Sequence, residues 1–295
     1  MSSVHEAAYQ GRAFVSVDVE QDISLYLRDS FQGVEEGIPR LLDLFAAERV
    51  RADFFIQGSL LPDHADVLAE IPRKGHGVGV HGFRHHRLFL RPGFAQGRLL
   101  ARSTDLVAQA TGARPRMFRA PGFSISEGTF DVLEHLGYDL DSSVMPGAVL
   151  RMLRRKIVVR DFRGAPRVPY HPARGDFLAE GARDILEVPL TENPEFAGAP
   201  VGLGYLNTRG IEATIRALDA VPGPYCTFLL HSWEAVDLGA HHPGLPEYVR
   251  QECSADLGPL RTALGALADR WTLDTLTSLR GRTGPRRGAA PGGRP

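Results

Sequence analysis

The sequence lacks any long hydrophobic run, since no window approaches about eighteen uninterrupted apolar residues. A transmembrane helix needs about 20 predominantly apolar residues, so a membrane span is not expected. The first twelve residues, MSSVHEAAYQGR, also contain no apolar core of signal-peptide length. We therefore expect a cytoplasmic protein.

Cysteine is scarce, and neither sign of charge is in excess. The two cysteines, Cys226 and Cys253, lie on separate predicted elements without the spacing of a metal site, so we expect two reduced, partly buried thiols. Lys and Arg total 34 and Asp and Glu total 35, for a formal net charge of −1. Such a balance provides no overall field for a nucleic-acid backbone or an anionic membrane. We expect neither as a partner.

What the sequence does contain is a regular alternation of short apolar runs with segments of helical period. The predicted strands are 13–19, 52–58, 77–82, 116–121, 138–143, 185–190, 225–231 and 271–276, and the predicted helices are 38–49, 62–75, 93–112, 126–137, 208–221 and 254–270. Strand–helix alternation predicts a parallel sheet that is either closed into a barrel or doubly wound.

One segment, residues 144–184, interrupts this alternation with a predicted hairpin and a polar, Pro-rich loop. It either shapes a substrate entrance or is a plain surface excursion. Residues 281–295 are rich in Gly, Pro and Arg and lack periodicity, which predicts a disordered tail. We expect one catalytic domain over residues 1–280.

Chemically active side chains follow several of the predicted strands. Asp18 and Glu20 end the first strand in SVDVEQD, and His81 and His85 follow the third in VHGFRHHRL. Further along the chain, the fourth, fifth and seventh strands end at Arg119, Asp141 and His231. Because the carboxyl ends of parallel strands meet at one edge, these groups are expected to lie together.

Their chemistry is that of a metal-assisted amide hydrolase. Two imidazoles and a carboxylate can hold a metal and leave positions open for water and substrate, and such a metal lowers the pKa of bound water towards about 7. Asp18 and Glu20 are separated by one residue, so both project on one face of a strand. One can bind metal while the other takes the proton of the attacking water, and His231 can protonate the leaving nitrogen. His86 directly follows His85 and is expected to have a loop role.

These motifs resemble those of the polysaccharide deacetylases, also called NodB-like or carbohydrate esterase family four, over about residues 13–276. The resemblance is carried by ADFFIQG with AEIPRKGHGVGVHGFRHHRL, by FRAPGFSIS, by YDLDSS and by TFLLHSWE. The first motif, Asp-Val-Glu, is similar to that of a subgroup with Asp-x-Asp or Asp-x-Glu. The resemblance implies an α/β fold, a distorted (β/α) barrel with about seven parallel strands.

Position by position, the resemblance implies that Asp18 is the general base and His231 the general acid. It implies that Glu20, His81 and His85 bind a divalent metal, with zinc foremost and cobalt, nickel or iron as alternatives. Because the motif is Asp-Val-Glu rather than adjacent aspartates, Asp18 and Glu20 could exchange roles.

Three further residues take roles from the same resemblance. Arg119 would hold the base carboxylate, Asp141 would tune the acid histidine, and the backbone N–H of Gly122 would help bind the oxyanion. The sequence departs from the family at Arg84, where a small hydroxyl residue is usual, and after Asp141, where the usual tryptophan is absent. Arg84 could instead face a substrate phosphate or carboxylate.

The expected activity is removal of an N-acetyl group from an amino sugar or a related acetylated intermediate, small or carrier-linked. The alternatives are hydrolysis of a cyclic amide or imide on the same fold, or an inactive glycan-binding homologue.

Overall fold

The computed structural model describes residues 3–23, 25–85, 87–152 and 157–280. The strands are β1 (Arg12–Val19), β2 (Asp53–Ile56), β3 (Gly77–Val80), β4 (Met117–Phe118), β5 (Leu140–Asp141), β6 (Val149–Met152), β7 (Ile157–Asp161), β8 (Leu186–Glu187), β9 (Tyr225–His231) and β10 (Thr272–Asp274). The α-helices are α1 (Ser3–Tyr9), α2 (Ile38–Ala47), α3 (Leu61–Arg73), α4 (Gly93–Thr111), α5 (Glu127–His135), α6 (Leu203–Asp219), α7 (Leu238–His241), α8 (Glu247–Arg250) and α9 (Gly258–Arg270). Among the described helices, none has the length and apolarity needed to cross a membrane.

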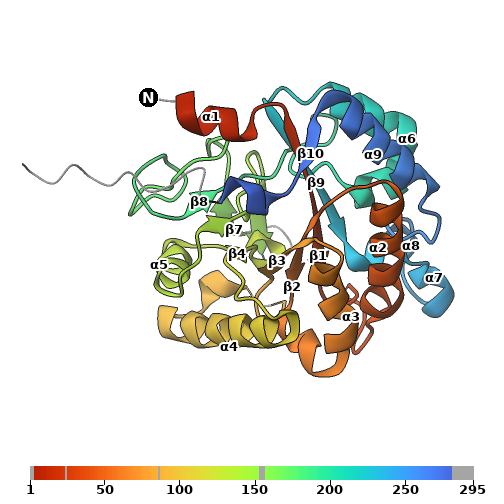
Figure 1. The fold of residues 1–295 in the computed structure, drawn as a ribbon, viewed down its shortest axis with the longest axis horizontal. Helices are drawn as coiled ribbons and strands as arrows, with labels where there is room; N and C mark the ends of the chain where they lie inside the picture. The colour runs from red at the N-terminus through yellow and green to blue at the C-terminus, as the bar shows by residue number, and fades with distance from the viewer. Residues whose placement is uncertain (1–2, 24, 86, 153–156, 281–295) are drawn as a thin grey trace, which may run out of the picture.

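The main sheet is parallel throughout and curls into an incomplete barrel with helices on its outside (Figure 1). Its order is β10-β1-β2-β3-β4-β5-β8, and β9 pairs with β1 along the side of β1 away from β2. A single parallel bridge, between Gly202 and Leu229, links the segment after β8 to β9. The distorted (β/α) barrel expected from the sequence is confirmed.

Alternation along β1 separates two cores. Val15, Val17 and Val19 belong to the large cluster between the sheet and its helices. Phe14 belongs instead to a second cluster with one residue from each of several other strands. The members of this second cluster include Phe55, Met117, Leu140, Leu186 and Tyr225. It fills the barrel interior on the same face of β1 as Ser16 and Asp18.

Four of the six predicted helices, α2 to α5, begin within one residue of the observed start, and the larger differences are at the starts of α6 and α9. Helix α6 begins at Leu203, five residues before the predicted start at 208, and contains a break at Gly210, where φ is +80°. A π-helical turn, Gly33–Gly37, precedes α2. Helix α4 ends as predicted, with Gly112 in the left-handed region that favours glycine at a helix C-terminus.

The predicted hairpin in the 144–184 insertion is confirmed by the antiparallel pair β6–β7. The later part of the insertion is held against α5 by the buried side chain of Arg183, which pairs with Glu127, Asp131 and Glu134. The two predicted thiols are also observed as free cysteines, Cys226 being buried. The predicted tail, residues 281–295, lies outside the described residues.

Candidate active site

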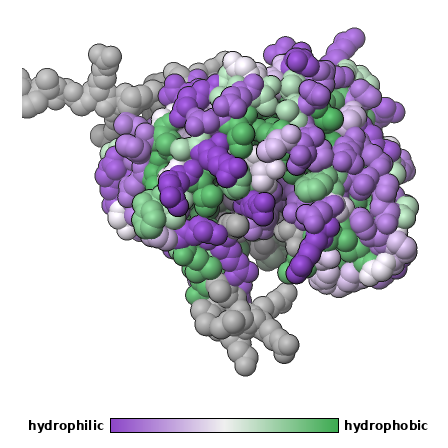
Figure 2. Space-filling model, turned by 90° about the horizontal axis from the view of Figure 1, so that it is seen from below, coloured by the Kyte–Doolittle hydropathy of each residue, from purple (hydrophilic) through white to green (hydrophobic). Residues whose placement is uncertain are grey.

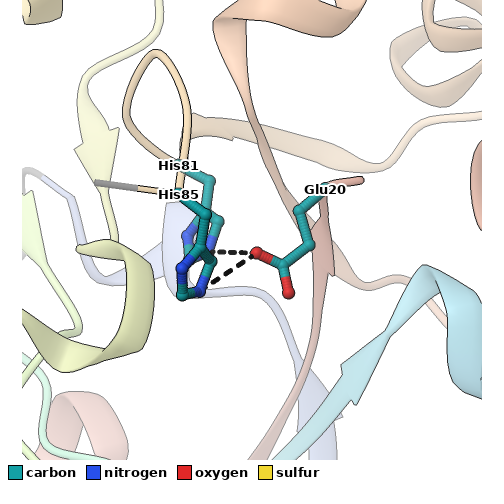
Figure 3. Close-up of side chains that lie close together, drawn as sticks. All are labelled: Glu20, His81 and His85. Atoms are coloured by element: carbon teal, nitrogen blue, oxygen red, sulfur yellow. Dashed lines mark ion pairs between the residues drawn. The ribbon is translucent and has the colours of Figure 1, made fainter. Parts of the chain in front are cut away.

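Three potential metal ligands converge just beyond the carboxyl ends of β1 and β3. Glu20 Oε2 lies 3.5 Å from His81 Nε2 and 3.5 Å from His85 Nε2. One ligand atom from each residue can be chosen so that all three lie within 4.8 Å of one another. Figure 3 shows the two imidazoles side by side, both facing the same carboxylate oxygen.

Each ligand is positioned by a different neighbour. His81 is 2% exposed, and its Nδ1 lies 3.0 Å from the carbonyl oxygen of Arg119, so an Nδ1–H donated there leaves Nε2 to face Glu20. The indole Nε1 of Trp233 lies 3.4 Å from the other carboxylate oxygen, Glu20 Oε1. His85 is more exposed, and its ring borders Gly122, because a Cβ added to Gly122 would lie 3.4 Å from His85 Cε1.

The arrangement fits a divalent cation. Within the described part of the chain, buried Glu20 Oε2 has no hydrogen-bond partner, although it faces two imidazole nitrogens. Burial raises the pKa of Glu20, but contact with His81 and the charges of His85 and His81 outweigh this effect and hold the pKa at about 2. An ionised carboxylate with an unsatisfied oxygen beside two imidazoles is a donor set suited to zinc or a similar metal.

Asp18 is held apart from this set by Arg119. The Arg119 guanidinium is fully buried, and its Nη1 donates to Asp18 Oδ1 at 2.9 Å and to Ser16 Oγ at 2.9 Å. Its Nε and Nη2 donate to the carbonyl and hydroxyl oxygens of Ser142, and its Cζ lies 4.3 Å from the centre of the Phe55 ring. Asp18 Oδ2 remains 3.9 Å from His81 Nε2. The structure thus joins Asp18 to Arg119, as predicted.

The strand register brings His231 to the same place. In the parallel pairing of β1 with β9, the partner of Asp18 is His231. The His231 ring stacks on Trp233 with a centroid distance of 4.9 Å and an interplanar angle of 21°. The sheet therefore sets a carboxylate and an imidazole side by side at its edge, next to the potential metal ligands.

Glu234 holds His231, which the sequence did not predict. Glu234 Oε1 lies 3.1 Å from His231 Nδ1, and Glu234 Oε2 accepts the backbone N–H of His231 at 2.8 Å. Burial alone would lower the pKa of His231, but the charge and hydrogen bond of Glu234 raise it to about 10. The signal was present in LLHSWE, where histidine and glutamate are three residues apart.

Asp141 does not take the place predicted for it beside His231. Its register partner is Glu187 on β8, and Ser143 Oγ donates to its Oδ1 at 2.7 Å. Burial raises the pKa of both Asp141 and Glu187, as expected of two buried carboxyl groups that share a proton. The structure therefore places Glu234, and not Asp141, in contact with the His231 imidazole.

The remaining predicted residues lie around the site. Gly122, with a φ of +56°, follows Pro121 in the turn after β4 and borders His85. Arg84 is exposed in the loop between His81 and His85. His86 lies outside the described residues.

Comparisons with known proteins find relatives of part of this chain. Residues 26–140 match the family described as "Polysaccharide deacetylase". A peptidoglycan deacetylase of Helicobacter pylori is 33% identical over 128 residues, covering 43% of this chain and 42% of that protein. A peptidoglycan-N-acetylmuramic acid deacetylase of Bacillus subtilis is 28% identical over 108 residues, covering 36% of this chain and 41% of that protein. The matches thus span less than half of these relatives.

Solved structures share the fold over most of the chain. A candidate polysaccharide deacetylase from Mycobacterium smegmatis aligns with a TM-score of 0.57 and 21% identity, covering 91% of this chain and 94% of that one. A carbohydrate esterase family 4 pseudoenzyme from Bacillus anthracis aligns with a TM-score of 0.55 and 12% identity, covering 92% of this chain and 65% of that one. The matched segment and the relatives thus show that residues 26–140 are similar to the polysaccharide deacetylase family, also known as the NodB-like family or carbohydrate esterase family 4, and the solved structures show the same fold over most of the chain.

Proposed function

We propose that this chain is a metal-dependent hydrolase that removes an N-acetyl group from an amino sugar, either a small molecule or one linked to a carrier. The observation that carries the proposal is the convergence of Glu20, His81 and His85 within 4.8 Å, with Asp18 and His231 paired across two neighbouring strands beside them. Such a set provides a cation site, a base and an acid at one edge of the sheet.

Glu20, His81 and His85 would hold the cation. Bound there, a divalent ion such as zinc, or alternatively cobalt, nickel or iron, would polarise the acetyl carbonyl and lower the pKa of a water molecule towards about 7. The identity of the ion is a matter for measurement, because imidazole and carboxylate ligands suit several of these metals.

Asp18 is the proposed general base. Arg119 donates a hydrogen bond to Asp18 Oδ1, whereas Oδ2 lies on the side of His81. Oδ2 is therefore the proposed recipient of the proton of the attacking water. A base must be held at a fixed angle to be effective, and the four hydrogen bonds made by the buried Arg119 side chain supply that rigidity.

His231 is the proposed general acid. With Nδ1 donating to Glu234, the Nε2–H of the imidazolium is the proton available to the leaving nitrogen. The backbone N–H of Gly122, beside His85, would donate to the oxyanion that develops on the acetyl oxygen. Atoms balance as in any amide hydrolysis: the C–N bond breaks, water supplies the carboxylate oxygen, and the amine leaves with the proton of His231.

Similarity to the family does not by itself establish activity, because a Bacillus anthracis protein with this fold is a pseudoenzyme. A binding protein that had lost catalysis would not need an acid, a base and three potential metal ligands at one place. Hydrolysis of a cyclic amide or imide would use the same groups, so the substrate must be determined directly.

The test joins metal analysis of the purified protein to a screen for acetate release from N-acetylated sugars and nucleotide sugars, with cyclic imides assayed in parallel. We expect about one divalent ion per chain and acetate release. His85→Ala should lose the metal with an unchanged circular dichroism spectrum, whereas the matched control His135→Ala, at an exposed histidine of α5, should retain it. Full metal content in His85→Ala, or a metal-loaded protein that releases no acetate from any acetylated sugar, would contradict the proposal.

A further inference from the structure

Exposed hydrophobic side chains gather at one end of the molecule. Among the described residues, the large hydrophobic side chains that are exposed are Leu25, Tyr26, Leu90, Phe94, Val158, Phe196 and Tyr248. Each lies in a segment that follows the carboxyl end of a sheet strand, after β1, β3, β5, β8 or β9. This is the end that carries the candidate active site.

Strands β1 and β9 run downward in Figure 1. Figure 2, which views the molecule from below, therefore looks towards this end and shows hydrophobic areas among hydrophilic ones. Exposed apolar area concentrated on one face indicates a binding surface rather than ordinary scatter.

Positive charge is concentrated next to the same end, although the whole chain is balanced. Residues 81–104, which follow the carboxyl end of β3, contain five Arg and no Asp or Glu. The described strands of the β6–β7 hairpin, a second segment, add Arg151 and Arg160. The net charge of −1 therefore conceals a strong local excess. The expectation that no field would attract an anionic surface came from the net charge alone.

The two segments meet in the structure. Phe89, in the 3₁₀ turn Leu88–Leu90, lies under Arg160 of β7, with the guanidinium carbon 5.9 Å from the ring centre. The first segment also contains the potential metal ligands His81 and His85, so this surface begins at the rim of the candidate active site.

The most prominent part of this surface is the stretch from 84 to 98. Leu90 is 60% exposed and Phe94 is 74% exposed. The other exposed side chains here are mainly basic: Arg84, Arg87, Arg91 and Arg98. We call the six residues Arg84, Arg87, Leu90, Arg91, Phe94 and Arg98 the basic–apolar surface. Phe94 and Arg98 are one helical turn apart at the start of α4, so they share a face of that helix.

We infer that the basic–apolar surface binds an anionic phospholipid surface, placing the active-site rim against the lipid headgroups. A soluble anionic polymer would be attracted by the arginines and could stack on Phe94, but it would gain little from an aliphatic side chain such as Leu90 held in water. An interface between headgroups and acyl chains accommodates both, because apolar side chains insert while guanidinium groups remain with the phosphates. The inference goes beyond the proposed hydrolysis and does not depend on it.

Vesicle sedimentation tests the inference with the full-length chain. We expect binding to vesicles of equimolar phosphatidylcholine and phosphatidylglycerol, little binding to phosphatidylcholine alone, and weaker binding as salt is raised. Arg87→Gln/Arg98→Gln should reduce partitioning roughly tenfold or more, since each basic residue near the surface contributes about fivefold. Leu90→Ser/Phe94→Ser, which keeps every charge, should also reduce partitioning, by about threefold or more.

The matched control is Arg49→Gln/Arg51→Gln, at exposed arginines between α2 and the amino end of β2, and it should bind as wild type does. Circular dichroism and the melting temperature establish that each variant is folded. Equal binding to both kinds of vesicle, or wild-type binding by both surface variants, would overturn the inference. So would binding to a soluble polyanion such as heparin without binding to vesicles, which would assign the surface to an anionic polymer.

Discussion

Glu234 contacts His231 at two points: Oε1 lies 3.1 Å from the imidazole Nδ1, and Oε2 accepts the backbone N–H at 2.8 Å. One carboxylate therefore fixes both the ring and the main chain of the proposed acid. The same contact sets the charge of the ring, because burial lowers the pKa of His231 and Glu234 more than reverses that effect, raising the pKa to about 10. The pair also stabilises the fold below the ordinary histidine pKa of about 6.5, and this contribution is lost as the pH rises through about 10.

Glu234→Gln should move the alkaline limb of kcat to lower pH. Glutamine carries no charge and has one acceptor oxygen for the two N–H groups that Glu234 accepts, so the pKa of His231 should fall and the acid should lose its proton earlier as the pH rises. The rate loss should therefore be larger at about pH 9 than at about pH 6. A pH–rate profile of the metal-loaded variant, beside wild type, measures this shift.

The matched control for that profile is Asp141→Asn. Because Asp141 pairs with Glu187 and not with His231, this variant should leave the alkaline limb where it is in wild type. An alkaline limb that moves in Asp141→Asn and stays in Glu234→Gln would return the tuning role to Asp141.

Asp141 and Glu187 should instead govern how stability depends on pH. Both are fully buried and have a raised pKa, so the folded protein binds a proton that the unfolded chain releases above about pH 4. Stability should then fall as the pH rises from about 4 through the folded pKa, by up to about 1.4 kcal/mol per pH unit for one proton. Asp141→Asn cannot release that proton, so its stability curve should be flatter. Urea unfolding at a series of pH values gives the slopes, and equal slopes would contradict the shared proton.

Local patterns were enough to predict most of the site. The alternation in AFVSVDV places Asp18 on the interior face of β1, and the strand ends at 80 and 231 locate His81 and His231. These side chains lie at or directly beside the ends of predicted strands, so strand prediction and the family resemblance are enough to locate them. The structure agrees with the predicted grouping of Glu20, His81 and His85.

The partner of Asp141 could not be obtained in the same way. Asp141 and Glu187 are 46 positions apart and separated by the insertion, and only the pairing of β5 with β8 makes them neighbours. Likewise, the start of α6 at Leu203 depends on tertiary packing, since a Cβ added to Gly202 would lie 2.1 Å from the carbonyl oxygen of Leu229. Strand order and close backbone approach are properties of the assembled sheet, and neither leaves a periodic signal in the sequence.

Asp18→Asn should retain the metal and lose activity. Asparagine can still accept from Arg119, so the buried hydrogen bonds remain, but it cannot take a proton from water. A loss of about 10²- to 10⁴-fold in kcat is expected for a removed general base. Metal content by elemental analysis and kcat at saturating substrate are the measurements. Loss of the metal would instead mean that Asp18 and Glu20 exchange roles.

His231→Ala should affect amides far more than activated esters. An amide nitrogen is a poor leaving group until it gains a proton, whereas an aryl oxide leaves without one. Removing the proposed acid should therefore reduce acetate release from an N-acetyl sugar by about 10²-fold or more and change aryl acetate hydrolysis much less. Glu234→Gln, which keeps the imidazole, should fall between wild type and His231→Ala on the amide. Equal losses on both substrates would show that His231 positions the substrate and does not protonate the leaving group.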